Sequence, residues 1–192
     1  MRFSDLRQIA KQTQTTFLDW IFPPKCLLCD KDLEFHAESQ QAICDRCDSQ
    51  VKPVKPPACL KCGYPLGDHV EIKARCDQCR NSTLWFDRSL CAGLYKDGFE
   101  TLVKAFKFQR RFDIAPFLAK SMAAKILEQQ IQNSVHVALC VPPRPGSVAQ
   151  RGFHPPQILA KLIAKRLQIP LISNALYATR RLQPQHLSLI HI

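Results

Sequence analysis

The pattern of apolar and polar residues at the start of the chain predicts an amphipathic helix. Apolar residues such as Leu6, Ile9 and Phe17 recur at helical spacing, and Pro23-Pro24 ends the run. We therefore expect residues 1–24 to form a helix of their own. Its apolar face is expected to pack against a neighbouring part of the protein rather than against a membrane.

A second stretch of regular patterning begins near residue 85 and predicts an α/β domain. Strands are expected at residues 88–95 and 135–141, and helices at residues 99–108, 114–131 and 158–167. The segment 135–141 is nearly all apolar, which is typical of a strand buried on both faces of a parallel sheet. The helical residues expected to face the core are Leu102, Val103, Phe106, Leu118, Met122, Ile126 and Leu127.

The loop that follows the strand 135–141 is a candidate binding site. It contains Arg144 and Arg151, whose guanidinium groups present forked donors suited to phosphate or pyrophosphate oxygens, and Gly152, which permits close approach of the backbone. A strand followed by a basic loop and a helix places a ligand at the carboxyl edge of a parallel sheet. Cations also gather at the end of the helix 99–108, and they suit either phosphate binding or a solvated helix C-terminus. They are Lys104, Lys107, Arg110 and Arg111.

The composition narrows the choice of partners. The chain has 27 Lys and Arg residues against 16 Asp and Glu residues, a formal charge of +11, which favours nucleic acid or phosphorylated small molecules. The sequence contains no P-loop, no dinucleotide-binding glycine motif and no Ser-His-Asp arrangement. We also expect a cytoplasmic protein with no membrane span, because charged residues interrupt the N-terminus and no apolar stretch is long enough to cross a bilayer.

Cysteines between the N-terminal helix and the α/β domain form the strongest motif. Eight of them fall in four Cys-x-x-Cys pairs, with spacings close to those of zinc ribbons, and the second set of four begins 33 residues after the first. Two pairs supply the four thiolates that a structural zinc ion prefers. We therefore expect a double zinc ribbon over residues 25–81, with two structural Zn²⁺ ions held by Cys26, Cys29, Cys44, Cys47, Cys59, Cys62, Cys76 and Cys79.

The same cysteines allow three other arrangements. A disulfide framework would require a secreted protein, and a redox Cys-x-x-Cys would not need four pairs in tandem. An interleaved cross-brace would use the same cysteines, so spacing leaves the pairing of the knuckles open. Closed four-thiolate shells have no free coordination position, and these metals are therefore expected to stabilise the fold rather than to catalyse a reaction.

Other residues of the cysteine-rich segment have simpler interpretations. Gly63 is expected to adopt a positive φ in the turn of its knuckle, and His36 and His69 are expected to be solvated loop residues. Cys91 and Cys140 lie outside the repeat in apolar surroundings and are interpreted as small buried residues.

The order of parts resembles the ComF family, which includes the GntX-type proteins. The resemblance rests on the cysteine-rich double ribbon, on LYKDGFETLVKAFKFQRRFDIAPFLA, and on VPPRP followed by RGFHPPQILA. ComF proteins resemble type I phosphoribosyltransferases fused to a zinc module, and the family is associated with natural competence and DNA uptake. The resemblance makes Lys107 the lysine of the family's LKF-like segment and makes Arg151, Gly152 and Phe153 its RGF motif.

The same resemblance implies partners and a reaction class. It implies phosphoribosyl pyrophosphate with Mg²⁺ in the intact protein, and single-stranded DNA and competence-machinery proteins as partners. The expected fold is thus a phosphoribosyltransferase-like partial domain, a parallel sheet with flanking helices over residues 85–186. A zinc-dependent protein that binds single-stranded nucleic acid without transferase activity is the alternative.

Several positions depart from the family pattern. His154-Pro155 follows RGF where Asn-Gln is usual, and residues 146–150 lack the usual basic run. The acidic pair and Thr-Thr-Gly motif that contact ribose and its phosphate do not occur in the 192 residues. We therefore expect a truncated, inactive transferase. Residues 187–192 (LSLIHI) are what the sequencing-library adapter CTGTCTCTTATACACATC encodes in one frame, although Leu187 and Ser188 also suit the family.

Overall fold

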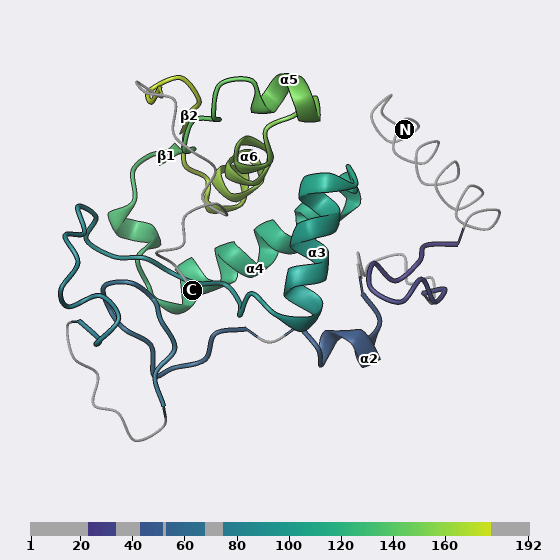
Figure 1. Cartoon of the computed structure of the whole chain (residues 1–192), viewed down its shortest axis with the longest axis horizontal. Coiled ribbons are helices and arrows are strands. Elements are labelled where there is room, and N and C mark those ends of the chain that lie inside the picture. The colour runs from purple at the N-terminus through teal and green to yellow at the C-terminus, as the bar shows by residue number, and fades with distance from the viewer. Residues whose placement is uncertain (1–22, 34–42, 52, 68–74, 178–192) are drawn as a thin grey trace, which may run out of the picture. The chain divides into compact units, whose positions relative to one another are not determined.

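A computed structural model describes residues 23–33, 43–51, 53–67 and 75–177 (Figure 1). The expected N-terminal helix, His36, His69 and the segment 187–192 lie outside the described residues, apart from the two prolines that follow the helix. Contacts divide the chain into two units, Met1–Lys52 with Tyr95–Val103, and Pro53–Leu94 with Lys104–Ile192. In the described part of the chain, no helix is both long enough and apolar enough to pass through a membrane.

The first unit contains a one-turn helix, α2 (Asp45–Asp48), and the beginning of α3 (Asp97–Phe108). Gly98 lies in the first turn of α3 where a side chain would be crowded. A Cβ atom added there would lie 3.1 Å from both Leu28 Cδ1 and Val51 Cγ2. The first turn of α3 therefore packs closely on the first cysteine knuckle. Buried side chains of this unit include Leu33, Ile43, Val51, Phe99 and Leu102.

Helix α3 confirms the helix predicted over residues 99–108 and begins two residues earlier. Its charged residues interact favourably with the helix dipole, because Asp97 and Glu100 lie in the first turn and Lys107 lies in the last. Leu102 and Phe106 are fully buried, as predicted. Val103 is half-buried, so it contributes less to the core than expected.

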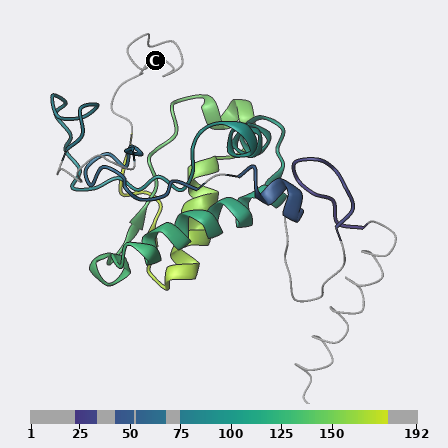
Figure 2. The same cartoon turned by 90° about the horizontal axis from the view of Figure 1, so that it is seen from below.

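The second unit is built on two long helices, α4 (Ala115–Glu128) and α6 (Pro155–Leu167), which lie against each other in both views (Figures 1 and 2). They confirm the helices predicted over residues 114–131 and 158–167. Each has proline in its first turn, where the missing N–H costs no hydrogen bond. The shorter helical elements are η1 (Phe112–Ile114), η2 (Gln132–Ser134) and α5 (Ser147–Arg151).

The buried face of α4 differs from the one predicted. Leu118 is buried, but Met122 and Leu127 are exposed and Ile126 is half-buried. Alanines spaced four apart form the buried face together with Leu118, and the small alanine side chains permit close packing of neighbouring helices. These buried residues are Ala115, Leu118, Ala119 and Ala123.

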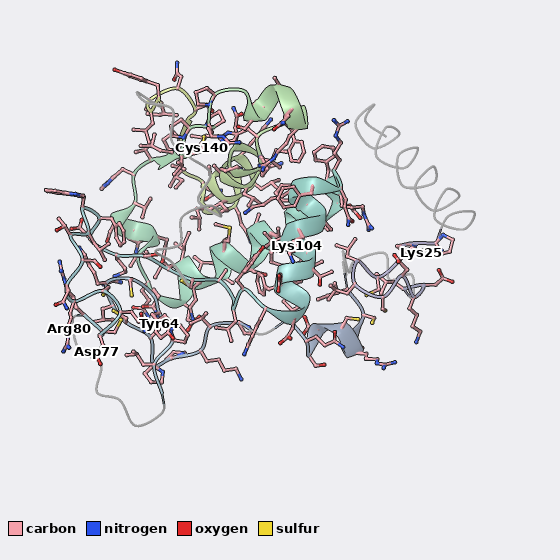
Figure 3. All side chains as sticks on the ribbon, viewed as in Figure 1. Lys25, Tyr64, Asp77, Arg80, Lys104 and Cys140 are labelled. Carbon is pink, nitrogen blue, oxygen red and sulfur yellow. The ribbon has the colours of Figure 1, made fainter. Side chains whose placement is uncertain are left out.

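A two-stranded parallel sheet forms from β1 (Ala138–Leu139) and β2 (Leu171–Ile172), which are joined through α5 and α6. The parallel arrangement agrees with the prediction, but the strand covers only two of the seven residues 135–141. Burial on both faces was wrong, because Leu139 and Val141 are 43% and 73% exposed. The described sheet has a single pair of strands, too little to enclose both faces. Cys140, labelled in Figure 3, is buried as predicted.

The strand predicted over residues 88–95 was also wrong. This segment is irregular and makes only an isolated bridge between Gly93 and Pro53. The backbone N–H of Ser89 donates instead to the carbonyl oxygen of Lys61 at 2.9 Å. The segment is thus held by a cysteine knuckle rather than by a neighbouring strand.

Candidate functional site

The eight repeated cysteines form two separate clusters, one in each unit. Within each cluster, the four sulfur atoms all lie within 4.8 Å of one another. Neighbouring knuckles combine, so the interleaved cross-brace that the spacing left open does not occur. The first cluster is Cys26, Cys29, Cys44 and Cys47, and the second is Cys59, Cys62, Cys76 and Cys79.

The two clusters repeat in structure as well as in sequence. The N–H of Cys26 donates to the carbonyl of Lys31 at 2.8 Å, and 33 residues later the N–H of Cys59 donates to that of Tyr64 at the same distance. These bonds close the tight turn that aims both sulfur atoms of a Cys-x-x-Cys pair in one direction. The sequence repeat therefore builds the same knuckle twice.

Asp30 and Gly63 occupy equivalent places in the two turns, and both have left-handed backbones, with φ of 56° and 73°. Asp30 demonstrates that the turn itself accepts a side chain. Gly63 is required for a second reason, because a Cβ there would lie 2.8 Å from Ser89 O and 3.0 Å from Cys91 Sγ. The predicted positive φ of Gly63 is confirmed, and the packing of the 88–95 segment explains the glycine.

Sulfur separations in both clusters suit a zinc ion. Four thiolates at a Zn–S distance of about 2.3 Å define a tetrahedron with edges of about 3.8 Å. Cys29 Sγ lies 3.8 Å from Cys44 Sγ in the first cluster. In the second cluster Cys59 Sγ lies 3.8 Å from Cys79 Sγ. The donor set therefore fits two structural Zn²⁺ ions.

Backbone amides stabilise one thiolate in each cluster. The N–H of Cys44 donates to Cys26 Sγ at 3.3 Å, and that of Cys76 donates to Cys59 Sγ at 3.3 Å. Burial opposes ionisation of both thiols, but these and neighbouring amides outweigh it and lower the pKa of Cys26 and of Cys59 to about 6. Each cluster thus has one thiol that the protein itself prepares as a ligand.

Other thiols of the clusters resist ionisation on their own. Burial, together with sulfur neighbours, raises the pKa of Cys47. Burial is also the main cause that raises the pKa of Cys62 to about 12 and that of Cys79 above its usual value. A divalent cation among the sulfur atoms compensates for this burial, because coordinated thiols lose their protons.

The clusters differ in their exposure to solvent. In the first, Cys29 is exposed and Cys44 is half-buried. In the second, no cysteine is exposed and only Cys62 is half-buried. Leu66 and Leu84 pack against the buried sulfurs of the second cluster.

The candidate phosphate-binding loop connects β1 to α6. It contains the short helix α5, with one turn before the helix and one after it. The amide and hydroxyl groups of Ser147 donate to the carbonyl of Arg144 at 3.0 Å and 2.7 Å, which fixes the turn before the helix. Gly146 and Gly152 flank the helix with φ of 80° and 79°. The glycines therefore set the path of the loop, and Arg144 lies exposed at its start.

The end of α3 meets this loop at Gly152. A Cβ atom added to Gly152 would lie 3.7 Å from Arg110 Nη2, so this guanidinium stands directly beside the loop backbone. The guanidinium of Arg151 stacks 5.1 Å from the centre of the Phe108 ring. The Arg110 guanidinium thus lies beside Gly152, whereas Arg151, the residue before this glycine, has its guanidinium on the Phe108 ring. Lys107 is exposed on the same helix, and its role in binding stays a prediction.

Arg110 lies at this site although no sequence motif identified it as a binding residue. The sequence marked it only as one of several cations near the end of a helix, because its approach to Gly152 depends on tertiary packing. Phe153 supplies that packing: its ring centre lies 4.8 Å from that of Phe112 and 6.0 Å from that of Phe106. This aromatic contact holds the loop against the end of α3.

Comparisons with known proteins agree with the metal clusters. No curated protein and no solved structure matches the chain. Residues 17–80, one third of the chain, match the family model of the double zinc ribbon domain, and this chain therefore contains a double zinc ribbon.

Proposed function

We propose that this chain is a ComF-type protein in which the double zinc ribbon accompanies a phosphoribosyltransferase-like domain, and that the loop after β1 binds the pyrophosphate group of phosphoribosyl pyrophosphate. One observation supports the binding site above all others. The Arg110 guanidinium lies beside Gly152, and the adjacent Arg151 stacks on Phe108, at a loop that follows a strand of a parallel sheet.

The chemistry of this arrangement suits an anion with several oxygens. Guanidinium groups donate in pairs to phosphate oxygens, and Gly152 places no side chain of its own beside the Arg110 guanidinium. Stacking on Phe108 restricts Arg151 before any ligand arrives, so less conformational entropy is lost on binding.

Local charge supports the same proposal. Residues 104–177 contain eleven Lys and Arg residues but only two Asp and Glu residues. One of the two acids, Asp113, pairs with Arg111 at 2.8 Å. The remaining positive charge attracts polyanionic ligands over a range of about 10 Å at moderate ionic strength.

We expect binding without group transfer from residues 1–192. Transfer of a phosphoribosyl group develops positive charge on the ribose, which needs nearby carboxylates. The acidic pair and Thr-Thr-Gly motif that would supply them are not among these residues. Mg²⁺ would accompany the ligand through its pyrophosphate oxygens. Genomic DNA that encodes such a motif downstream of codon 186 would support the family assignment, whereas a gene without the motif would count against it.

Calorimetric titration with pyrophosphate tests the binding site. Arg151→Ala and Arg110→Ala should each weaken binding about tenfold or more, because each removes a hydrogen bond between charged groups. Arg166→Ala, at an exposed position in the last turn of α6, is the matched control and should leave affinity within about twofold, as expected for screened charges. Equal losses in all three variants would show attraction by net charge alone.

A second candidate function is binding of single-stranded nucleic acid by the second ribbon. Trp85 is 94% exposed and Phe86 and Tyr64 are also exposed, so aromatic rings are available for stacking with bases. Lys61 donates to the carbonyl of Phe86, and its ammonium lies 5.6 Å from the centre of that ring. Aromatic rings with an adjacent cation are the usual elements of such surfaces.

Fluorescence anisotropy with a labelled oligothymidine, on the full zinc-loaded chain, tests this candidate. Trp85→Ala should weaken binding by one stacking interaction, about fivefold to a hundredfold. Tyr177→Ala, which removes another exposed aromatic ring of the second unit, is the control. Binding that is equally strong in both variants would exclude stacking on Trp85.

A further inference from the structure

The two cysteine clusters differ in a way that their common ligand set does not require. Both clusters are built from two Cys-x-x-Cys pairs, yet Cys29 alone among the eight cysteines is exposed. Cys44, whose sulfur lies 3.8 Å from that of Cys29, is half-buried, whereas Cys26 and Cys47 are buried. The two most accessible sulfurs of the first cluster are therefore in contact with each other.

We propose that the first cluster is an oxidation site at which Cys29 and Cys44 form a disulfide and release zinc, while the second cluster keeps its metal. Cys29 Sγ and Cys44 Sγ lie 3.8 Å apart. A disulfide bond needs about 2.05 Å, so closure requires the sulfurs to approach by less than about 2 Å. Closure thus needs only a small movement of the two knuckle turns that carry these sulfurs.

The second cluster lacks this combination of exposure and contact. Its half-buried thiol, Cys62, has Cys76 as a neighbour at 3.6 Å, but Cys76 is buried. Leu66 and Leu84 also cover the cluster. An oxidant therefore reaches Cys62 less readily than it reaches the exposed Cys29, so metal loss from the second cluster is expected to be slower.

The oxidation is balanced with hydrogen peroxide as the oxidant. The thiolate of Cys29 attacks one peroxide oxygen, the O–O bond breaks, and hydroxide leaves as the sulfenic acid forms. The thiolate of Cys44 then attacks the Cys29 sulfur, and a second hydroxide leaves as the S–S bond forms. Two electrons pass from sulfur to peroxide. Cys26 and Cys47 would then be the remaining thiolate ligands of the cluster, too few to hold a structural zinc ion.

Loss of this zinc has a direct structural consequence within the first unit. Leu28 lies between the two ligands of the first knuckle, and its side chain packs against Gly98 in the first turn of α3. Release of the knuckle therefore removes a contact from the first turn of that helix. The first unit would respond to oxidant by loosening around α3.

Zinc release from the full zinc-loaded chain during treatment with hydrogen peroxide tests the proposal. A chromogenic chelator should report one equivalent released about tenfold faster than the second, since reactivity follows the accessibility of the thiolate. Peptide mass spectrometry of the protein at the end of the fast phase should find the Cys29–Cys44 disulfide. Reductant with added zinc should restore the original metal content.

Two kinds of variant make the outcome specific. Cys91→Ala with Cys140→Ala removes the thiols outside the clusters and should leave the fast phase unchanged. Cys29→His keeps a nitrogen ligand for zinc and should abolish the fast phase of zinc release. If this variant does not bind zinc, the identity of the first disulfide in the unaltered chain tests the proposal instead. Equal release rates for the two metals, or a first disulfide that joins any other pair, would overturn the proposal.

Discussion

The ammonium group of Lys125 donates a hydrogen bond to the backbone carbonyl of Val54 at 2.7 Å. Lys125 lies on α4, and Val54 lies in the segment that leads into the second ribbon, so one side chain ties the zinc-binding segment to the helical part of the second unit. Val54 is buried, and the carbonyl acceptor is therefore poorly placed to find water instead.

Replacement of Lys125 by methionine should lower the free energy of unfolding by about 1.5–3 kcal/mol, because a charged hydrogen bond is lost and the Val54 carbonyl is left without its donor. Urea denaturation measures this. Glu128→Gln is the control, since it removes only the partly exposed ion pair to Lys125 at 2.9 Å and should cost less than about 1 kcal/mol. Similar losses in both variants would assign the effect to the ion pair.

Gly63→Ala should destabilise the second ribbon more than Gly146→Ala destabilises its loop. Both glycines have φ near 80°, so both substitutions carry a left-handed backbone penalty of about 1–2 kcal/mol. At Gly63 the new Cβ would meet Ser89 O, at 2.8 Å, whereas no atom of the described residues lies within 4 Å of a Cβ at Gly146. Zinc retention against a chelator should fall in Gly63→Ala alone; equal retention in both would contradict this explanation.

Metal analysis of the purified chain should find two zinc ions per molecule, because each cluster supplies a complete tetrahedral donor set. Cys26→Ser and Cys59→Ser should each reduce the content to one, since each removes the thiolate that backbone amides stabilise. Cys140→Ala, which removes a buried thiol outside the clusters, should keep both metals. A content of one in the unaltered chain would refute the two-site assignment.

The metal ligands could be predicted from sequence because a Cys-x-x-Cys pair encodes its geometry locally. The turn from Cys26 to Lys31 aims two sulfurs at one point without help from distant residues. The pairing of knuckles could not be predicted, because it depends on how the chain returns after each loop. For the same reason, the greater exposure of Cys29 compared with Cys62 could not be predicted from the Cys-x-x-Cys motif.

Helices were predicted better than strands, and the reason is again the range of the interactions. The start of α6 follows from its own prolines, whereas β1 requires Leu171 and Ile172 as partners more than thirty residues away. The segment 88–95 has the apolar content of a strand, but a knuckle carbonyl at Lys61 accepts its hydrogen bond. Local pattern alone cannot distinguish these two partners.

The candidate binding loop was identified from sequence only in part. Arg151 and Gly152 could be selected from their motif, but the approach of Arg110 depends on how the rings of Phe112 and Phe153 pack. No periodicity links residues forty positions apart. The phosphoribosyltransferase-like fold of the whole domain remains a proposal that rests on resemblance and on this loop.

Phe153→Ala should lower the free energy of unfolding by about 2–4 kcal/mol and should also weaken pyrophosphate binding, because the ring holds the loop against the end of α3. Phe153→Leu retains much of the apolar volume and should cost less in stability while still loosening the loop. Thermal unfolding and calorimetry measure the two effects. A Phe153→Ala protein with unchanged pyrophosphate affinity would separate the aromatic cluster from the binding site.

His154 gives the second unit a dependence on pH. Burial lowers the pKa of this histidine below its usual value of about 6.5. Below about pH 6.5 the unfolded chain therefore takes up a proton at this position more readily than the folded chain, and the free energy of unfolding falls as the pH falls. The contribution is fully present above the pKa of the unfolded state and is lost on acidification.

His154→Gln removes this titration while keeping a polar side chain at the residue that precedes α6. The unfolding free energies of the two proteins, measured in parallel by urea denaturation from about pH 7.5 downward, should diverge in favour of the variant as the pH falls through about 6.5. Protonation of the zinc ligands affects both proteins alike, so it cancels in the difference. A difference that stays constant across this range would show that His154 is equally protonated in the folded and unfolded chains.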